Sequence, residues 1–600
     1  MPVAASDPPA AHAPLATSLI DFFQAGSQPS GAVVYDTFVG SGNCKFCHAQ
    51  DGDTALAIHG PWQGSMMSQS ARDPLFYACL TIANQDAAFA GDLCLRCHTP
   101  SGWISGRSEP TDGSALLAVD RDGVNCSVCH RMVDPVFEPG ESPPIDQSIL
   151  AAIQPLPLQP GGANVVFDPE DRRRGPYDSV TNPGHPWLAS GFMRSAELCG
   201  TCHDVSNPAY WRQTDGTYRL TQFGREHPTG NKYDMFPLER TYSEWLHSEF
   251  ARRGVDMGGR FGGSRSVVRT CQDCHMPVEA GKGCMFAGVR EDLAAHEFAG
   301  GNTWVQDMIW NLYPNDGLDA GLLEAGKERS RSMLERACTL DGIQQGNQLT
   351  VRVRNETGHK LPTGYPEGRR MWIHLSILDQ TLAVLEERGR YDAVEAVLTT
   401  NDTKVYEIRL GLDEAGAALT GLPAGEGFHF AVNNRIFKDN RIPPRGFANA
   451  AYRAAQAMPV GATYADGQFS DDTTFRLPQG ASLATIDIYY QTASREFISF
   501  LQDENRTDAR GKILYEQWNE TGRSPPVLMA SKTIHLHPFA SGDADGDGVI
   551  GPFDFAQWIG CFQGPSGGLA VPGCEIFDFD SDNDIDLSDL AAFQQYFGAS

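Results

Sequence analysis

Residues 271–275 read CQDCH, two cysteines separated by two residues and followed at once by a histidine. The same pattern occurs four more times, as CKFCH at 44–48, CLRCH at 94–98, CSVCH at 126–130 and CGTCH at 199–203. With this cysteine and histidine content, random order would give about 0.01 copies in the chain. We call each pentapeptide a socket, and the repetition requires a chemical explanation.

Covalent haem attachment explains the sockets. In c-type haem proteins the two thiols form thioethers with the two vinyl groups, and the adjacent imidazole binds the iron from below. Zinc sites use converging cysteine pairs or distant histidines, and a redox C-x-x-C occurs singly on a thioredoxin-like βαβ unit. The sequence therefore predicts five covalent haems. The thioether residues are Cys44, Cys47, Cys94, Cys97, Cys126, Cys129, Cys199, Cys202, Cys271 and Cys274, and the proximal ligands are His48, His98, His130, His203 and His275.

The spacing of the sockets indicates a mainly α or irregular domain packed around haem, at residues 41–344 after an N-terminal segment 1–40. Amphipathic periodicity is weak here, and Pro and Gly recur. Haem faces then supply much of the core. The clearest expected helix covers 321–340, where apolar residues approximate one stripe.

Each haem iron also takes a distal ligand or keeps an open position for substrate. His59 in HGPWQGS and His185 in HPWLAS stand in a repeated motif, His-(Gly)-Pro-Trp-x-x-Ser. The repeat suggests a distal histidine beside a tryptophan. His247 in TYSEWLHSEF and His296 in HEFAGGN are two further candidates, the latter because Gly lets backbone approach a haem edge. The alternatives to these are His227, Met66, Met67 and Met193.

Several segments resemble the multihaem c-type cytochrome superfamily, which includes tetrahaem cytochromes of nitrifiers, pentahaem nitrite reductases and octahaem hydroxylamine oxidoreductases. They are GDLCLRCHTP, DGVNCSVCHRM, ELCGTCHDVSNP, ERTYSEWLHSEF, CQDCHMP and HEFAGGNTW. The resemblance implies haem loading outside the cytoplasm, hence a periplasmic, extracellular or cell-surface location. The first thirty residues show no export signal, so we expect that it has been removed or omitted. The chain lacks the C-x-x-C-K motif of nitrite reductases, so no catalytic centre is transferred.

The sequence pattern of residues 345–540 predicts an antiparallel β-sandwich. The expected strands are QLTVRVRN, RMWIHLSILD, KVYEIRLGL, FHFAVNN and ATIDIYYQT. A loop at 355–370, NETGHKLPTGYPEGRR, is similar to a GHKLPTG segment that accompanies many multihaem cytochromes. This resemblance makes His359 the fifth distal candidate, with Arg369 or Arg370 facing haem propionates.

The last sixty residues, 541–600, hold eleven Asp or Glu and no Lys or Arg. Two segments repeat the spacing of a calcium loop, with carboxylates at positions 1, 3, 5 and 12 and an apolar residue at position 8. The ligand candidates are Asp543, Asp545, Asp547, Val549 and Asp554 in the first loop, and Asp578, Asp580, Asp582, Asp584 and Asp589 in the second. A helix is expected after each loop. The module therefore predicts two Ca²⁺ ions.

The duplicated loop-helix pattern resembles dockerin modules, which implies a surface docking partner or self-assembly. Cys561 and Cys574 bracket the segment between the loops and are candidates for a disulfide; Cys284 with Cys338 is another possible pair. The net charge of -28 excludes nucleic acid and anionic lipid as partners, and no apolar run approaches the roughly 18 residues of a membrane span.

Three functions fit these observations. The first is an extracytoplasmic pentahaem protein that passes electrons along a closely spaced array to redox partner proteins, fixed through its calcium module. The second is an oxidoreductase for a small nitrogen or sulfur compound at one five-coordinate haem. The third is a structural haem protein of a cell-surface filament. Electron transfer is favoured over catalysis, because the candidate ligands suffice for all five irons.

Overall fold

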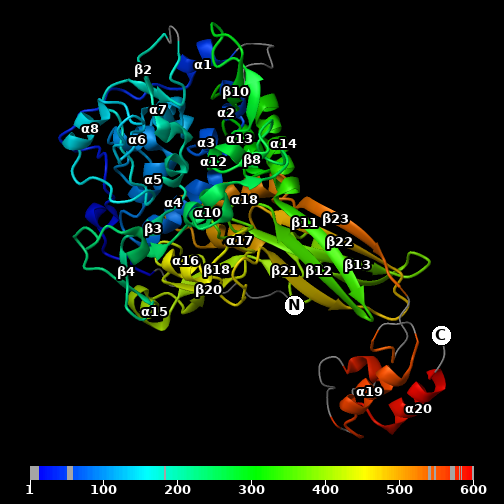
Figure 1. Cartoon of the computed structure of the whole chain (residues 1–600). Coiled ribbons are helices and arrows are strands. Elements are labelled where there is room, and N and C mark those ends of the chain that lie inside the picture. The colour runs from blue at the N-terminus through cyan, green and yellow to red at the C-terminus, as the bar shows by residue number, and fades with distance from the viewer. Residues whose placement is uncertain are drawn as a thin grey trace.

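The computed structural model describes residues 12–49, 58–180, 184–537, 542–545, 549–565, 567, 574–579, 582 and 584–597. Short helices and loops come first, antiparallel sheets follow, and a small helical module ends the chain, drawn in red at the bottom of Figure 1. The expected multidomain architecture of helices and antiparallel sheets is present. The boundaries at 41, 344 and 540 stay predictions.

The first region is built mainly from short helices, five of which carry the sockets or their first residues. Its helices are α1 (Gly42–His48), α2 (His59–Gln63), α3 (Met66–Gln69), α4 (Pro74–Asp86), α5 (Gly91–His98), α6 (Pro100–Ile104), α7 (Cys126–Arg131), α8 (Asp146–Ala152), α9 (Ala196–Gly200), α10 (Thr241–Leu246), α11 (Glu249–Arg253), α12 (Cys271–His275), α13 (Val305–Leu312) and α14 (Ala320–Ala337). Small ladders join the loops between them: β1 (Arg173–Gly175) with β2 (Trp187–Ala189), β3 (Ser206–Asn207) with β6 (Phe236–Pro237), β4 (Tyr210–Arg212) with β5 (Tyr218–Leu220), β7 (Val255–Asp256) with β8 (Val267–Val268), and β9 (Val278–Gly281) with β10 (Arg290–Ala294).

Helix α14 is shorter than the expected 321–340. Asp319 caps its first turn by accepting a hydrogen bond from the backbone N–H of Leu322. The helix ends at Ala337 because Cys338 adopts extended backbone and starts β11. Leu340 therefore belongs to a strand, where it pairs with Val353.

Two antiparallel sheets form the second region and share one core. The first contains β11 (Cys338–Gln345), β12 (Gln348–Asn355) and β21 (Ser470–Arg476); the second contains β13 (Arg370–Leu378), β14 (Val384–Arg388), β17 (Val405–Tyr406), β22 (Leu483–Gln491) and β23 (Val527–His535). Alternate residues of β12 are buried, as a strand with one face on the core requires. Leu349, Val351 and Val353 pack with residues of β13 and β22, which gives the sandwich interior.

The sequence predictions for this region were incomplete. A third small sheet joins β18 (Ile408–Leu412), β19 (Gly425–Glu426) and β20 (Arg435–Asp439). FHFAVNN at 428–434 is a turn segment, not a strand, and Phe430 and Val432 fill a core that they share with Ala83 of α4 and Leu93 of α5. Four helices were not expected: α15 (Glu414–Thr420), α16 (Asn449–Ala454), α17 (Arg495–Asp503) and α18 (Arg510–Glu520).

Helices α17 and α18 attach the sheet region to the socket region, the part of the chain from α1 to α14. Phe497 and Leu514 share a core with Ile82 of α4 and Trp304 ahead of α13. The indole Nε1 of Trp304 donates to the Thr521 hydroxyl at 2.7 Å. The two regions therefore hold one another through buried apolar surface.

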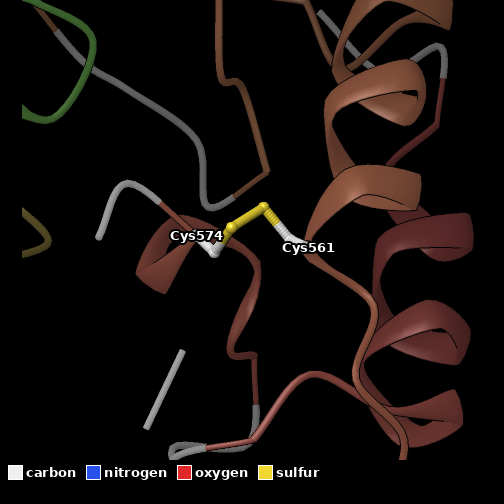
Figure 2. Close-up of a disulfide and its surroundings, with 2 residues drawn as sticks. All are labelled: Cys561 and Cys574. Atoms are coloured by element: carbon white, nitrogen blue, oxygen red, sulfur yellow. A yellow bond between two sulfur atoms is a disulfide. The ribbon is translucent and has the colours of Figure 1, made fainter. Parts of the chain in front are cut away.

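The C-terminal module packs α19 (Pro552–Cys561) against α20 (Leu587–Tyr596) through Trp558 and Phe593. The expected disulfide between Cys561 and Cys574 is formed (Figure 2). Cys284 and Cys338 are free thiols, so the second possible pair is not formed in this structure. Among the described residues, no helix is both long and apolar enough to cross a bilayer.

Candidate haem sites

Each socket places its two thiols about one helical turn apart, which puts them on one side of the helix. Four of the five sockets lie inside helices α1, α5, α7 and α12, and the fifth starts in α9. Side chains before three of them cap the turn: Asn125 accepts from the N–H of Val128, Thr270 from Asp273, and Ser195 from Glu197. The caps fix where these three helical turns begin.

Three socket histidines face a second histidine from a distant part of the chain. The ring centres are 6.5 Å apart for His48 and His185, with planes tilted by 39°. They are 6.3 Å apart at 19° for His130 and His296, and 6.4 Å apart at 17° for His275 and His359. Two metal–nitrogen bonds of about 2 Å, with about 1 Å from each nitrogen to its ring centre, require roughly 6 Å. The spacing fits an iron between the rings.

The Nδ1 atoms of these rings lie against backbone carbonyls. Among the socket histidines, His48 contacts the Gly283 oxygen at 2.5 Å, His130 the Arg174 oxygen at 2.6 Å, and His275 the Ala299 oxygen at 2.7 Å. The facing histidines use carbonyls close in sequence, at 3.1 Å for His185, 3.0 Å for His296 and 3.0 Å for His359. A carbonyl accepts only, so Nδ1 carries the proton and Nε2 is left to bind metal.

The segment 294–299 serves two sites at once. It brings His296 opposite His130 and supplies the Ala299 carbonyl to His275. The backbone N–H of Phe298 donates to the His275 oxygen at 2.9 Å, and Phe298 takes a positive φ of 46°. The turn at Phe298 thus lets neighbouring residues reach two sockets.

The loop at 355–370 is held by buried charges. The ammonium of Lys360 donates to Asp439 Oδ2 at 2.6 Å, and both side chains are almost fully buried. Arg441 binds the same carboxylate at 2.8 Å and also approaches Glu244. Because Glu244 accepts the backbone N–H of Lys360 at 3.1 Å, the cluster ties the loop to α10 and presents His359 to His275.

The other two socket histidines differ from these three. Within the described part of the chain, neither His98 nor His203 makes a ring contact with a second histidine, and the buried Nδ1 of His98 has no hydrogen-bond partner. His98 instead stacks on Phe76 with ring centres 3.9 Å apart. The Nδ1 of His203 contacts a carboxylate, Oε1 of Glu239, at 3.2 Å.

The pKa directions set His203 apart from the other four socket histidines, because burial lowers the pKa of each of those four. Burial lowers the pKa of His130 and of His275 to about 4, because a desolvated ring resists protonation. The side chain of His203 is half exposed, and the hydrogen bond and charge of Glu239 raise its pKa to about 9. The surroundings of His203 therefore favour positive charge at that ring.

Thiols from different sockets approach one another. The thiols of Cys44 and Cys126 lie near each other, as do those of Cys97 and Cys202 and those of Cys199 and Cys271. Cys129 interacts electrostatically with Cys199 and Cys202. The 199–203 socket thus neighbours three others, those at 94–98, 126–130 and 271–275.

Two of the five expected distal histidines are not brought to a socket ring. His59 is buried beside Trp62 of its own turn, with ring centres 5.5 Å apart. His247 lies near Tyr452, at 6.5 Å. Among the alternatives, His227 contacts Trp211, and Met66 packs against the core shared by α4 and α18. Their ligation stays a prediction.

Of the two arginines expected at propionates, Arg370 is bound within the sheet region, through Gln491 at 2.9 Å and Glu496. Arg369 donates from Nη1 to the Thr363 carbonyl, and its buried Nε has no partner among the described atoms. Such a donor fits a carboxylate-bearing cofactor edge.

The C-terminal carboxylates gather in two groups. Asp543, Asp545 and Asp554 form one, and Asp584, Asp586 and Asp589 form the other, each with ligand atoms within 4.8 Å of one another. Asp586 at loop position 9 was not predicted, although its spacing could have indicated it. Asp578 and Asp582 are not in these groups, Val549 adds no side-chain ligand, and Asp547 and Asp580 lie outside the described residues.

The contact of Glu239 with His203 was not predicted from the sequence either. It stands 36 residues after His203, and no pattern in the sequence links them.

Comparison with known proteins gives one structural likeness. No protein-family model matches the chain, and no curated protein matches it. The chain is similar to a penta-heme cytochrome c552 from Thermochromatium tepidum, with 18% identity and a TM-score of 0.44 over 83% of this chain and 99% of that one.

Proposed function

We propose that this chain is an extracytoplasmic pentahaem c-type cytochrome that carries electrons along its array of haems. One observation carries the proposal: three socket histidines each face a second histidine at 6.3–6.5 Å, the separation that a six-coordinate iron needs. Haem bound in this way supplies a one-electron couple without an open coordination position. The chain's part is to orient the rings and exclude water.

In this proposal, His185, His296 and His359 are the distal ligands of the haems carried by His48, His130 and His275. The sheet region then supplies a ligand to the socket region, because His359 comes from the loop before β13. The Lys360–Asp439 cluster supports the role, since it fixes the loop on which His359 stands.

We propose a haem order from the neighbouring thiols of different sockets. Sockets 44–48, 126–130, 199–203 and 271–275 form a continuous series, and socket 94–98 branches from 199–203. Porphyrins attached through neighbouring thiols would lie close enough for electron hopping. Redox partner proteins would meet the array at its ends.

A second function is favoured at two sites. Because His98 and His203 face no other imidazole among the described residues, either haem is a candidate for an open position that binds a small nitrogen or sulfur compound. Met, His59 or His247 at these irons would instead complete the electron-transfer array.

The C-terminal module is proposed to bind two Ca²⁺ ions and to dock the protein to a surface partner or to a copy of itself. The two carboxylate groups support the ion sites, since hard oxygen ligands within 4.8 Å suit Ca²⁺. The surface location rests on the haem attachment, which takes place outside the cytoplasm.

Intact-mass measurement of exported protein, with optical spectra before and after reduction, tests the proposal. We expect the mass of the chain plus five haems and a reversible shift of the haem bands. A colourless protein, or the mass of the bare polypeptide, would overturn it. Removing the cysteines of one socket, such as C271A/C274A, should subtract one haem and leave four.

A further inference from the structure

The five socket histidines differ in what holds their second nitrogen. At His48, His130 and His275 the partner is a neutral backbone carbonyl, at 2.5–2.7 Å. His98 has no partner for Nδ1 among the described residues. His203 alone in this set is held by a charged group, the carboxylate of Glu239 at 3.2 Å.

We propose that Glu239 is a positioning residue of the 199–203 socket that makes its haem the lowest-potential centre of the array. The inference rests on the proposed function, because it concerns the haem bound by His203. A histidine that donates to a carboxylate is a more basic ligand than one that donates to a carbonyl. A more basic axial ligand stabilises the oxidised iron and lowers the reduction potential.

The carboxylate is fixed where it can act. The Thr241 hydroxyl donates to Glu239 Oε1 at 3.0 Å. Thr241 is itself tied to the loop that carries His359, through the Thr363 hydroxyl at 3.0 Å and the Gly364 N–H at 3.1 Å. Glu239 is therefore an oriented carboxylate at Nδ1 of His203, which leaves Nε2 of that ring to bind the iron.

The position of the 199–203 socket determines how a low reduction potential of its haem affects electron transfer. Socket 199–203 neighbours the sockets at 94–98, 126–130 and 271–275 through its two thiols. A low-potential haem at this junction stays oxidised while the others are reduced. Electrons then reside on the haems of the neighbouring sockets. Electron transfer between those haems passes through the His203 haem by an energetically uphill step.

A general charge effect is the competing explanation, and the chain offers a matched control. Glu197 stands in α9 beside the same socket, where it accepts from the Tyr242 hydroxyl at 3.1 Å and has no hydrogen bond to His203. E197Q removes one negative charge near the same haem. E239Q removes one negative charge and also weakens the hydrogen bond acceptor of His203.

The test is a potentiometric titration of the haem-loaded full chain, followed optically and by EPR. For E239Q we expect the lowest of the five potentials to rise and the EPR signal of that haem to shift, with the other four potentials unchanged. E239D keeps the carboxylate, so it should raise the lowest potential by less than E239Q does. E197Q should move the lowest potential by less than half as much.

Three results would overturn the role of Glu239: no potential moves in E239Q, a potential other than the lowest moves, or E197Q produces an equal shift. Intact mass on the same samples separates this failure from that of the proposed function. Five haems with an unmoved potential reject the role of Glu239 alone, whereas a wild-type chain without five haems rejects the proposed function and this inference together.

Discussion

Replacing Lys360 by methionine should loosen the loop that presents His359. The Lys360 ammonium is fully buried and donates to Asp439 Oδ2 at 2.6 Å. Breaking a buried ion pair from one side costs about 3–5 kcal/mol, because it leaves a charge without compensation. Here Asp439 keeps its two bonds from Arg441, both at 2.8 Å, so we expect a smaller cost of about 2–3 kcal/mol.

Hydrogen exchange measures this cost locally. The backbone N–H groups of Leu361 and Ile442 bond to each other's carbonyls at 2.9 and 3.0 Å, next to the ion pair. If exchange follows local opening, about 2–3 kcal/mol corresponds to exchange that is roughly 30- to 150-fold faster at these two amides. The methionine side chain fills most of the space, so a cavity contributes little.

K404M is the matched control. Lys404 contacts Asp471 at 3.3 Å, but its side chain is 29% exposed, and such pairs contribute about 1 kcal/mol or less. Exchange at Leu361 and Ile442 should then stay within about fivefold of the wild type. If K360M and K404M change these amides equally, the buried cluster does not hold the His359 loop, and our reasoning is wrong.

Three further outcomes are expected. Burial raises the pKa of Glu367 to about 8, so the folded chain keeps a proton that the unfolded chain releases above about pH 4.5. The free energy of unfolding should therefore fall as the pH rises from about 4.5 to 8, by at most about 1.4 kcal/mol per pH unit, and should level off above pH 8. E367Q should flatten this slope in melting curves. The double variant C561S/C574S should destabilise only the C-terminal module, by about 3 kcal/mol for its 13-residue separation, as read from proteolysis of that module, and a destabilised sheet region would contradict this. Adding Ca²⁺ at about 100 times its Kd should stabilise the module by about 2.7 kcal/mol, and D554N/D589N should remove the effect; stabilisation that survives in the variant would exclude these carboxylates as ligands.

The sockets and most strands could be predicted because their signals are local. A socket is five consecutive residues, and β12 and β22 alternate buried and exposed residues along a single run. Asp543 and Asp584 follow from fixed loop spacing in the same way. Local patterns need no knowledge of how distant segments meet.

The pairing of axial ligands could not be predicted from the sequence. Which histidine faces which socket depends on long-range folding, as with His359, which stands 84 residues from His275. The repeated His-Pro-Trp motif suggested equal roles for His59 and His185. Of these two, only His185 lies opposite the ring of a socket histidine. FHFAVNN was predicted as a strand because it is rich in apolar and aromatic residues, yet these residues fill a core from a turn.

Low-temperature EPR of the oxidised, haem-loaded chain tests the central claim most directly. The account predicts at least three rhombic low-spin signals per chain, because the three facing histidine pairs have planes at 39°, 19° and 17°. Replacing His185, His296 or His359 by alanine should each abolish one of them. Fewer than three low-spin haems in the wild type, or three unchanged signals in all three variants, would contradict the account.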